Sequence, residues 1–156
     1  MRLGYRVRMV VNAANGSTLL GMLVAVAGRA RLSDGAHGLL VAEQYRLPVP
    51  AAPAFCVGNV IVTRMDRDAL TGADRLLAHE ARHATQYAWC AGPTMLPLYF
   101  IAAGLSWTLT GDFGSRNVFE RRAGLADGGY RDRPLRPALC SLYCWLKHAH
   151  TGKEQR

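Results

Sequence analysis

The pattern of apolar positions in the first half of the chain predicts one helical segment followed by two strands. Residues 1–32 predict an N-terminal apolar helix, densest over residues 10–29, with a break at Gly16 and Ser17. A turn at residues 33–35 precedes a strand over residues 39–45. Three prolines within residues 47–53 exclude helix and central strand, so this segment is predicted to be an extended linker. Residues 55–63, rich in Val and Ile, predict a second strand with a bulge at Gly58.

The second half of the chain has a helical pattern. Apolar residues recur at spacings of three and four from Leu70 to Ala84, which predicts a helix over residues 68–89. A strongly apolar helix is expected over residues 96–109, and another over residues 117–126, closed by Gly128 and Gly129. Residues 139–148 predict the last helix. This order indicates a single helix-rich α+β domain over residues 1–156, with a small antiparallel sheet.

The basic composition changes this picture little. The formal net charge is +8, but the 19 Lys and Arg residues are spread along the chain without a basic run. Nucleic acid is therefore an unlikely partner. The four cysteines are Cys56, Cys90, Cys140 and Cys144, in a chain large and apolar enough to fold without disulfides. Cys140 and Cys144 would share one helix face, either as packing residues or as part of a metal site.

The N-terminus leaves several cellular locations open. Arg2, Arg6 and Arg8 precede an uncharged stretch over residues 9–28, as in a signal peptide or an anchor. Polar residues interrupt that stretch, and the dense apolar run of residues 19–27 is short for a membrane span. A core helix, or a helix lying against a membrane, fits the pattern better. We expect a cytoplasmic or peripherally membrane-associated protein, with secretion not excluded.

The sequence His79-Glu80-Ala81-Arg82-His83 lies within the helix expected over residues 68–89 and has the form HExxH. Histidines four residues apart on a helix point the same way, so both imidazoles can bind one zinc ion. Glu80 lies beside them and is placed to accept a proton from water. Zinc lowers the pKa of a coordinated water toward about 7, so a carboxylate base suffices at neutral pH. The competing interpretation is a solvated helix that happens to carry two histidines.

A catalytic zinc site needs a third protein ligand and one open position. The downstream candidates are Asp112, Glu120, Asp127, His148 and His150. Glu120 is the best placed, because one apolar helix and a loop allow the chain to return antiparallel to the first metal helix. We expect one Glu120 oxygen within about 5 Å of both metal-facing ring nitrogens. Alternatively, Glu120 is a surface carboxylate paired with a neighbouring arginine.

Each of three further residues has two possible roles. Asp127 is an alternative ligand or a hydrogen-bond partner of a ligating histidine. Tyr87 and Tyr130 could polarise a substrate carbonyl, although a packing role is the commoner one for buried tyrosines.

With these residues the chain resembles the gluzincin branch of HExxH zinc metallopeptidases. The resemblance implies His79 and His83 as ligands, Glu80 as base and Glu120 as third ligand. The well-known gluzincin pattern has an aspartate four residues after the ligand glutamate, where this chain has Gly124.

The chain also resembles small bacterial metallopeptidase-like domains, including those attached to contractile injection systems and polymorphic toxins. The shared features are a Gly-Asn step in a strand, the sequence HExxHxxQ and a later helix with Glu before Ala. They cover residues 55–130, which would form a zincin-like metal-binding core. In zincins a sheet edge beside the metal helix pairs with the substrate, and the resemblance implies residues 57–63 as that edge.

The sequence therefore predicts a zinc-dependent hydrolase, with a peptide or protein as substrate and Glu80 activating the water. The alternative is a catalytically inactive module that zinc stabilises, docked to a membrane surface through the apolar helix of residues 96–109.

Overall fold

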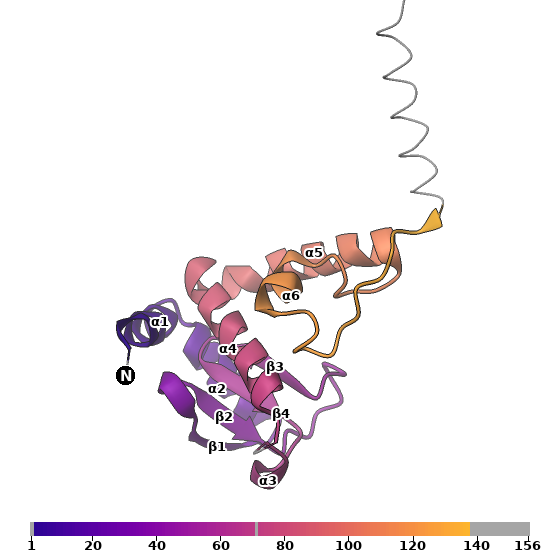
Figure 1. The fold of residues 1–156 in the computed structure, drawn as a ribbon. Coiled ribbons are helices and arrows are strands. Elements are labelled where there is room, and N and C mark those ends of the chain that lie inside the picture. Colours follow the sequence, from indigo (N-terminus) through magenta and orange to yellow (C-terminus); the bar gives the residue numbers. More distant parts are fainter. Residues whose placement is uncertain (1, 71, 138–156) are drawn as a thin grey trace, which may run out of the picture.

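A four-stranded sheet forms the centre of the computed structural model, which describes residues 2–70 and 72–137 (Figure 1). The strands are β1 (Arg31–Asp34), β2 (Leu40–Glu43), β3 (Ala54–Val57) and β4 (Val60–Thr63), in the order β1-β2-β4-β3. β1 pairs with β2, and β3 with β4, in antiparallel fashion, whereas β2 and β4 are parallel. The predicted α+β class is correct, but the sheet is mixed and not antiparallel. After β2, the linker of residues 47–53 leads to β3 at the outer position of the sheet. β4 then returns between β3 and β2, antiparallel to β3 and parallel to β2.

The segment predicted as one bulged strand is a hairpin. Gly58 and Asn59 form its two-residue turn, and Val57 pairs directly with Val60. Gly58 has a φ of +62°, and a Cβ there would lie 2.4 Å from the backbone of Ser17. A glycine is therefore required both by the turn and by the close approach of the next helix. The Gly-Asn step ends one strand and starts another, which hydrophobic alternation alone does not reveal.

The predicted N-terminal helix is two helices, α1 (Leu3–Ala14) and α2 (Ser17–Ala27), bent by 73°. The break falls at Gly16, which has a φ of +80°, and the Asn15 side chain accepts a hydrogen bond from the Ser17 amide. Helix α2 then covers one face of the sheet, where Ala25 packs among Ala42, Tyr45, Val60 and Val62. The break predicted at Gly16 and Ser17 is therefore present, but the helical segment ends at Ala27, and Arg31 and Leu32 already belong to β1.

Helix α4 (Asp74–Trp89) covers the opposite face of the sheet and follows the short helix α3 (Arg67–Leu70). Its Ala84 packs with Ala54, Cys56 and Ile61. Alternate residues of β4 therefore face α2 and α4, and all four of its residues are buried. Figure 1 shows the sheet between these two helices. This packing fixes one face of α4 and leaves its other face to the segments that follow.

The remaining helices are α5 (Met95–Thr110) and α6 (Val118–Ala123), with short 3-10 turns at η1 (Ala36–Gly38) and η2 (Gly92–Thr94). The apolar helix expected over residues 96–109 is therefore present. Helix α6 ends three residues earlier than expected, because Gly124 has a φ of +92°, and Gly128 and Gly129 lie beyond its end. The helix predicted over residues 139–148, with Cys140 and Cys144, lies outside the described residues.

No described helix is long and apolar enough to cross a membrane by itself. Two bent pairs, α1 with α2 and α4 with the η2–α5 segment, meet the length and composition criteria only when each pair is taken together.

Candidate metal centre

Helix α4 places His79, Glu80 and His83 in the interior. The residues are 2%, 4% and 6% exposed. Helix α4 lies on the sheet through Ala84, and both histidines line the same cavity. Their rings lie in a T-shaped arrangement with the Nε2 atoms 3.0 Å apart.

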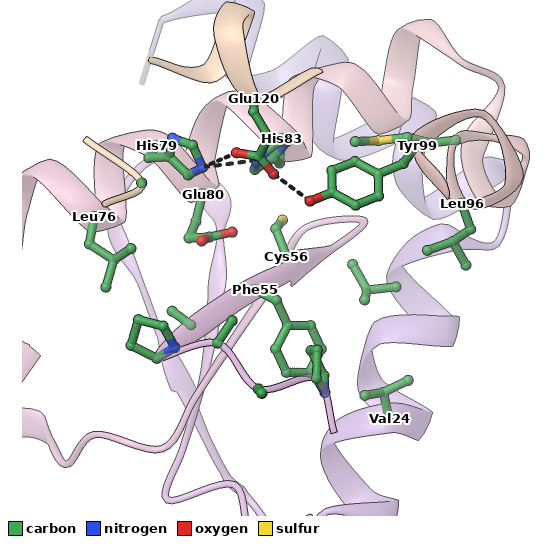
Figure 2. Close-up of a pocket in the computed structure, with 18 of the residues that line it drawn as sticks. Val24, Phe55, Cys56, Leu76, His79, Glu80, His83, Leu96, Tyr99 and Glu120 are labelled. Atoms are coloured by element: carbon green, nitrogen blue, oxygen red, sulfur yellow. Dashed lines mark hydrogen bonds and ion pairs between the residues drawn. The ribbon is translucent and has the colours of Figure 1, made fainter. Parts of the chain in front are cut away.

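Helix α6 brings Glu120 to the two histidines (Figure 2). Its Oε2 lies 3.1 Å from His79 Nε2 and 3.6 Å from His83 Nε2. Ligand atoms around a tetrahedral zinc with bonds of 2.0–2.2 Å would lie roughly 3.4 Å apart. His79, His83 and Glu120 are buried and lie close enough to hold a metal ion. Both distances fall within the 5 Å limit expected from the sequence, and Glu120 is not a surface carboxylate.

The hydrogen bonds around this triad suit a cation at its centre. Glu120 Oε2 is fully buried and receives no hydrogen bond. The other ring nitrogens face carbonyl oxygens, His79 Nδ1 at 3.0 Å from Gly124 O and His83 Nδ1 at 2.8 Å from Gln86 Oε1. Each Nδ1 can therefore donate to its carbonyl oxygen, and a ring that carries its proton there turns the lone pair of Nε2 toward Glu120. In that form the two Nε2 atoms and Glu120 Oε2 present three lone pairs to one point, which is the donor set that a metal ion requires.

Two residues that hold the imidazoles were not identified from the sequence. Gly124, at the position of the gluzincin aspartate, supplies its backbone carbonyl to His79. Gln86 accepts from His83 and donates through Nε2 to the Phe119 carbonyl at 2.9 Å, which ties α4 to α6 beside Glu120. Gln86 is the last residue of the HExxHxxQ pattern, so its spacing was visible in the sequence even though its contact was not.

Tyr99 of α5 holds the other oxygen of Glu120. Its hydroxyl donates to Glu120 Oε1 at 2.5 Å and leaves Oε2 free to face the histidines. Sequence reasoning missed Tyr99, and the only available signal was a single tyrosine within an apolar helix. Tyr130, a sequence candidate, interacts with Tyr99, and burial raises the pKa of Tyr130 to about 12. Both phenols therefore remain protonated at neutral pH.

The two buried carboxylates have opposite pKa shifts. Burial raises the pKa of Glu80 to about 7, although the two histidines lower it in part. Burial also disfavours the Glu120 anion, but the imidazoles and the Tyr99 hydroxyl outweigh burial and lower its pKa to about 2. Among the described residues no Lys or Arg side chain forms an ion pair with either group. A bound cation would supply the missing positive charge.

The triad borders a pocket of about 780 Å³ between α2, β3, α4 and α5. Figure 2 shows Glu80 pointing from α4 toward β3, with Leu96 of α5 and Val24 of α2 at the side of the pocket. The wall is mostly apolar, and its polar groups gather at the triad. This combination is typical of a ligand site, where apolar walls hold the ligand and a few polar groups orient it.

Gly128 packs directly on the face of His79. A Cβ at Gly128 would lie 2.4 Å from His79 Cε1 and 2.6 Å from His79 Nε2. The backbone amides of Asp127 and Gly128 both donate to the Gly124 carbonyl, at 3.0 and 3.2 Å. The loop after α6 thus supports His79 from two sides, with a carbonyl at Nδ1 and a glycine against the ring.

The other sequence candidates lie around the triad. Asp127 does not hydrogen-bond to either histidine among the described contacts, but pairs with Arg82 at 2.8 Å on the outer side of α4. Tyr87 is 2% exposed and packs with Val57 and Met95 while lining the pocket. Asp112 accepts hydrogen bonds in the loop before α6. His148 and His150 lie outside the described residues.

No protein-family model matches the chain, and no match is found among curated proteins or among solved structures.

Proposed function

We propose that the protein is a zinc-dependent hydrolase that cleaves peptide bonds. One observation supports this proposal above all. Two imidazole nitrogens lie next to a Glu120 oxygen that receives no hydrogen bond, at the wall of an open pocket that Glu80 also lines. Two histidines and one carboxylate form a ligand set that suits catalytic zinc and leaves one coordination position for water or substrate. A structural zinc site would instead be closed by four protein ligands.

Each of the chain's own residues has a separate part in this reaction. Zinc, when bound, would polarise the scissile carbonyl and acidify the attacking water. Glu80 takes the proton of that water and later gives it to the leaving amine, which completes the hydrolysis with no net change in the enzyme. Glu120 stays ionised, and Tyr99 fixes its orientation.

The position of β3 supports a peptide as substrate. β3 pairs with β4 on one side and, among the described strands, lies at the end of the sheet, while its residues line the pocket. An extended peptide can add to such an edge through backbone hydrogen bonds. The resemblance implied residues 57–63 as this edge, but β4 lies inside the sheet between β2 and β3. The proposed docking strand is therefore Ala54–Val57.

The proposal is tested by metal content and by one isosteric variant. We expect one tightly held zinc per chain and zinc-dependent cleavage of unstructured polypeptides. Glu80→Gln should keep the zinc and lose turnover by about 10²–10⁴-fold, since it removes the base and no ligand. Glu43→Gln is the control, because Glu43 lies on β2 and accepts a hydrogen bond from Ser33.

Two results would contradict parts of this proposal. A wild-type protein that binds zinc tightly and cleaves no peptide would favour the alternative, a zinc-stabilised module without turnover. A protein that binds no zinc, and whose thermal stability ignores added zinc, would remove the metal site itself.

A further inference from the structure

The pocket opens through an apolar mouth. Val49 in the linker and Phe100 on α5 both line the pocket, and each is 67% exposed. Residues that line a pocket and are also largely exposed mark its entrance. Pro50 and Ala51, which neighbour Val49, are exposed lining residues as well. The entrance therefore lies between the linker and α5, and its rim contains no charged side chain among these residues.

Apolar exposure continues from the mouth along the two helices that flank it. Leu20 and Val24 of α2 line the pocket, and Leu23 and Val26 on the adjacent part of α2 are 58% and 66% exposed. On α5, large apolar side chains are exposed beyond Phe100, namely Leu98, Ile101, Leu105 and Trp107. Large apolar side chains exposed in this number along two helices are rare on a monomer that contacts only water.

Basic groups lie beside this apolar surface. Arg29 follows α2 directly and is exposed, and the Arg46 amide donates to Gly28, which places Arg46 at the same helix end. The Arg64 guanidinium bonds to the carbonyls of Leu47 and Pro50 in the linker. At the far end of α5, Arg136 stacks on Trp107 at 5.0 Å. Within the described part of the chain, none of these four side chains has an acidic partner.

We propose that the face around the pocket mouth docks onto an anionic lipid bilayer, with Val49 and Phe100 entering the acyl boundary. Apolar side chains bordered by arginines are the chemistry of a helix surface that lies in the membrane interface. The arginines then meet lipid phosphates, which compensate charges that have no carboxylate partner among the described residues. The docking itself does not depend on the proposed function. Its consequence, that substrates reach the pocket from the bilayer surface, does rest on that function.

The experiment measures binding of the full-length protein to vesicles. The probes are vesicles of phosphatidylcholine alone and vesicles that also contain phosphatidylglycerol, separated by flotation. We expect binding to the anionic vesicles, weakened when salt rises from about 0.05 to about 0.5 M. Val49→Asp and Phe100→Asp should each lower the partition coefficient by about tenfold or more. Leu32→Asp is the matched control, because Leu32 is 44% exposed on β1, at the opposite end of the sheet from β3.

The outcomes separate docking from both its alternatives and the proposed function. The proposal is overturned if anionic vesicles do not bind the wild type, or if Leu32→Asp loses as much binding as Val49→Asp. It is also overturned if Val49→Asp and Phe100→Asp bind like the wild type, as they would if another segment held the lipid. Concentration-dependent dimers that these two variants abolish, without vesicle binding, would assign the face to a second copy of the chain. Glu80→Gln should bind vesicles normally, so loss of catalysis and loss of docking are read independently.

Discussion

Replacing Gly128 with alanine tests whether the loop after α6 sets the position of His79. The added methyl would start 2.4 Å from His79 Cε1 and 2.6 Å from Nε2. Carbon atoms in normal contact are about 3.5 Å apart, so the ring or the loop must move by about 1 Å. Metal–ligand distances tolerate about 0.2 Å. The required movement is several times larger than the site can absorb.

We expect Gly128→Ala to weaken zinc binding by about 10–100-fold, which corresponds to about 1.4–2.7 kcal/mol. Competition with a chromophoric chelator measures the affinity, and the melting temperature with and without zinc gives a second readout. Gly104→Ala is the control, because a Cβ at Gly104 in α5 meets nothing within 4 Å. Wild-type zinc affinity in Gly128→Ala would refute the reasoning, since the loop would then be free to move without disturbing His79.

Four further substitutions separate the roles of residues in and around the triad. Glu120→Ala should abolish tight zinc binding, whereas Asp127→Ala should change the zinc affinity little, because Asp127 pairs with Arg82 outside the triad. Chelator competition measures the affinity of both variants, and equal losses of affinity would contradict this prediction. Tyr99→Phe removes the donor to Glu120 Oε1 and should weaken zinc by about tenfold in the same assay, with unchanged affinity contradicting a positioning role. Burial opposes the Asp112 anion, but hydrogen bonds from Ser115 and Gly114 outweigh it and lower its pKa. That stability is present above the unfolded pKa of about 4 and is lost as pH falls through the lower folded value, so Asp112→Asn should melt with a shallower acid dependence, and an unchanged profile would contradict this.

The sequence was informative where the structure is local. An i, i+4 pair of histidines on a helix points one way whatever the surrounding fold, so the joint direction of His79 and His83 follows from helix geometry alone. The apolar helix expected over residues 96–109 is also present, because an apolar segment that spans several helical turns is a strong sequence signal. Boundaries were less accurate, since Gly124 ends α6 through a positive φ value that hydrophobic spacing does not encode.

The β3–β4 hairpin shows why the sheet topology could not be predicted from the sequence. Residues 55–63 are mostly apolar and are interrupted at Gly58 and Asn59, a pattern that fits either one bulged strand or a tight hairpin. The choice depends on Gly58, whose Cα must lie against the start of α2. That contact exists only once α2 has packed on the sheet. For the same reason, the free edge beside the pocket is β3 and not the segment of residues 57–63 that the resemblance implied.

By itself, then, the sequence determined the residue types of the candidate metal centre and the helix that presents two of them. Only the tertiary structure decided which groups surround them. The Gly124 carbonyl, the Gly128 backbone and the Tyr99 hydroxyl come from segments 20 to 49 residues away from His79. Backbone carbonyls and glycines have no side chain through which a sequence could reveal such a role. Their placement follows from the path of the chain across α5 and α6, because hydrogen bonds and close contacts act over a few ångströms, whatever the separation along the chain.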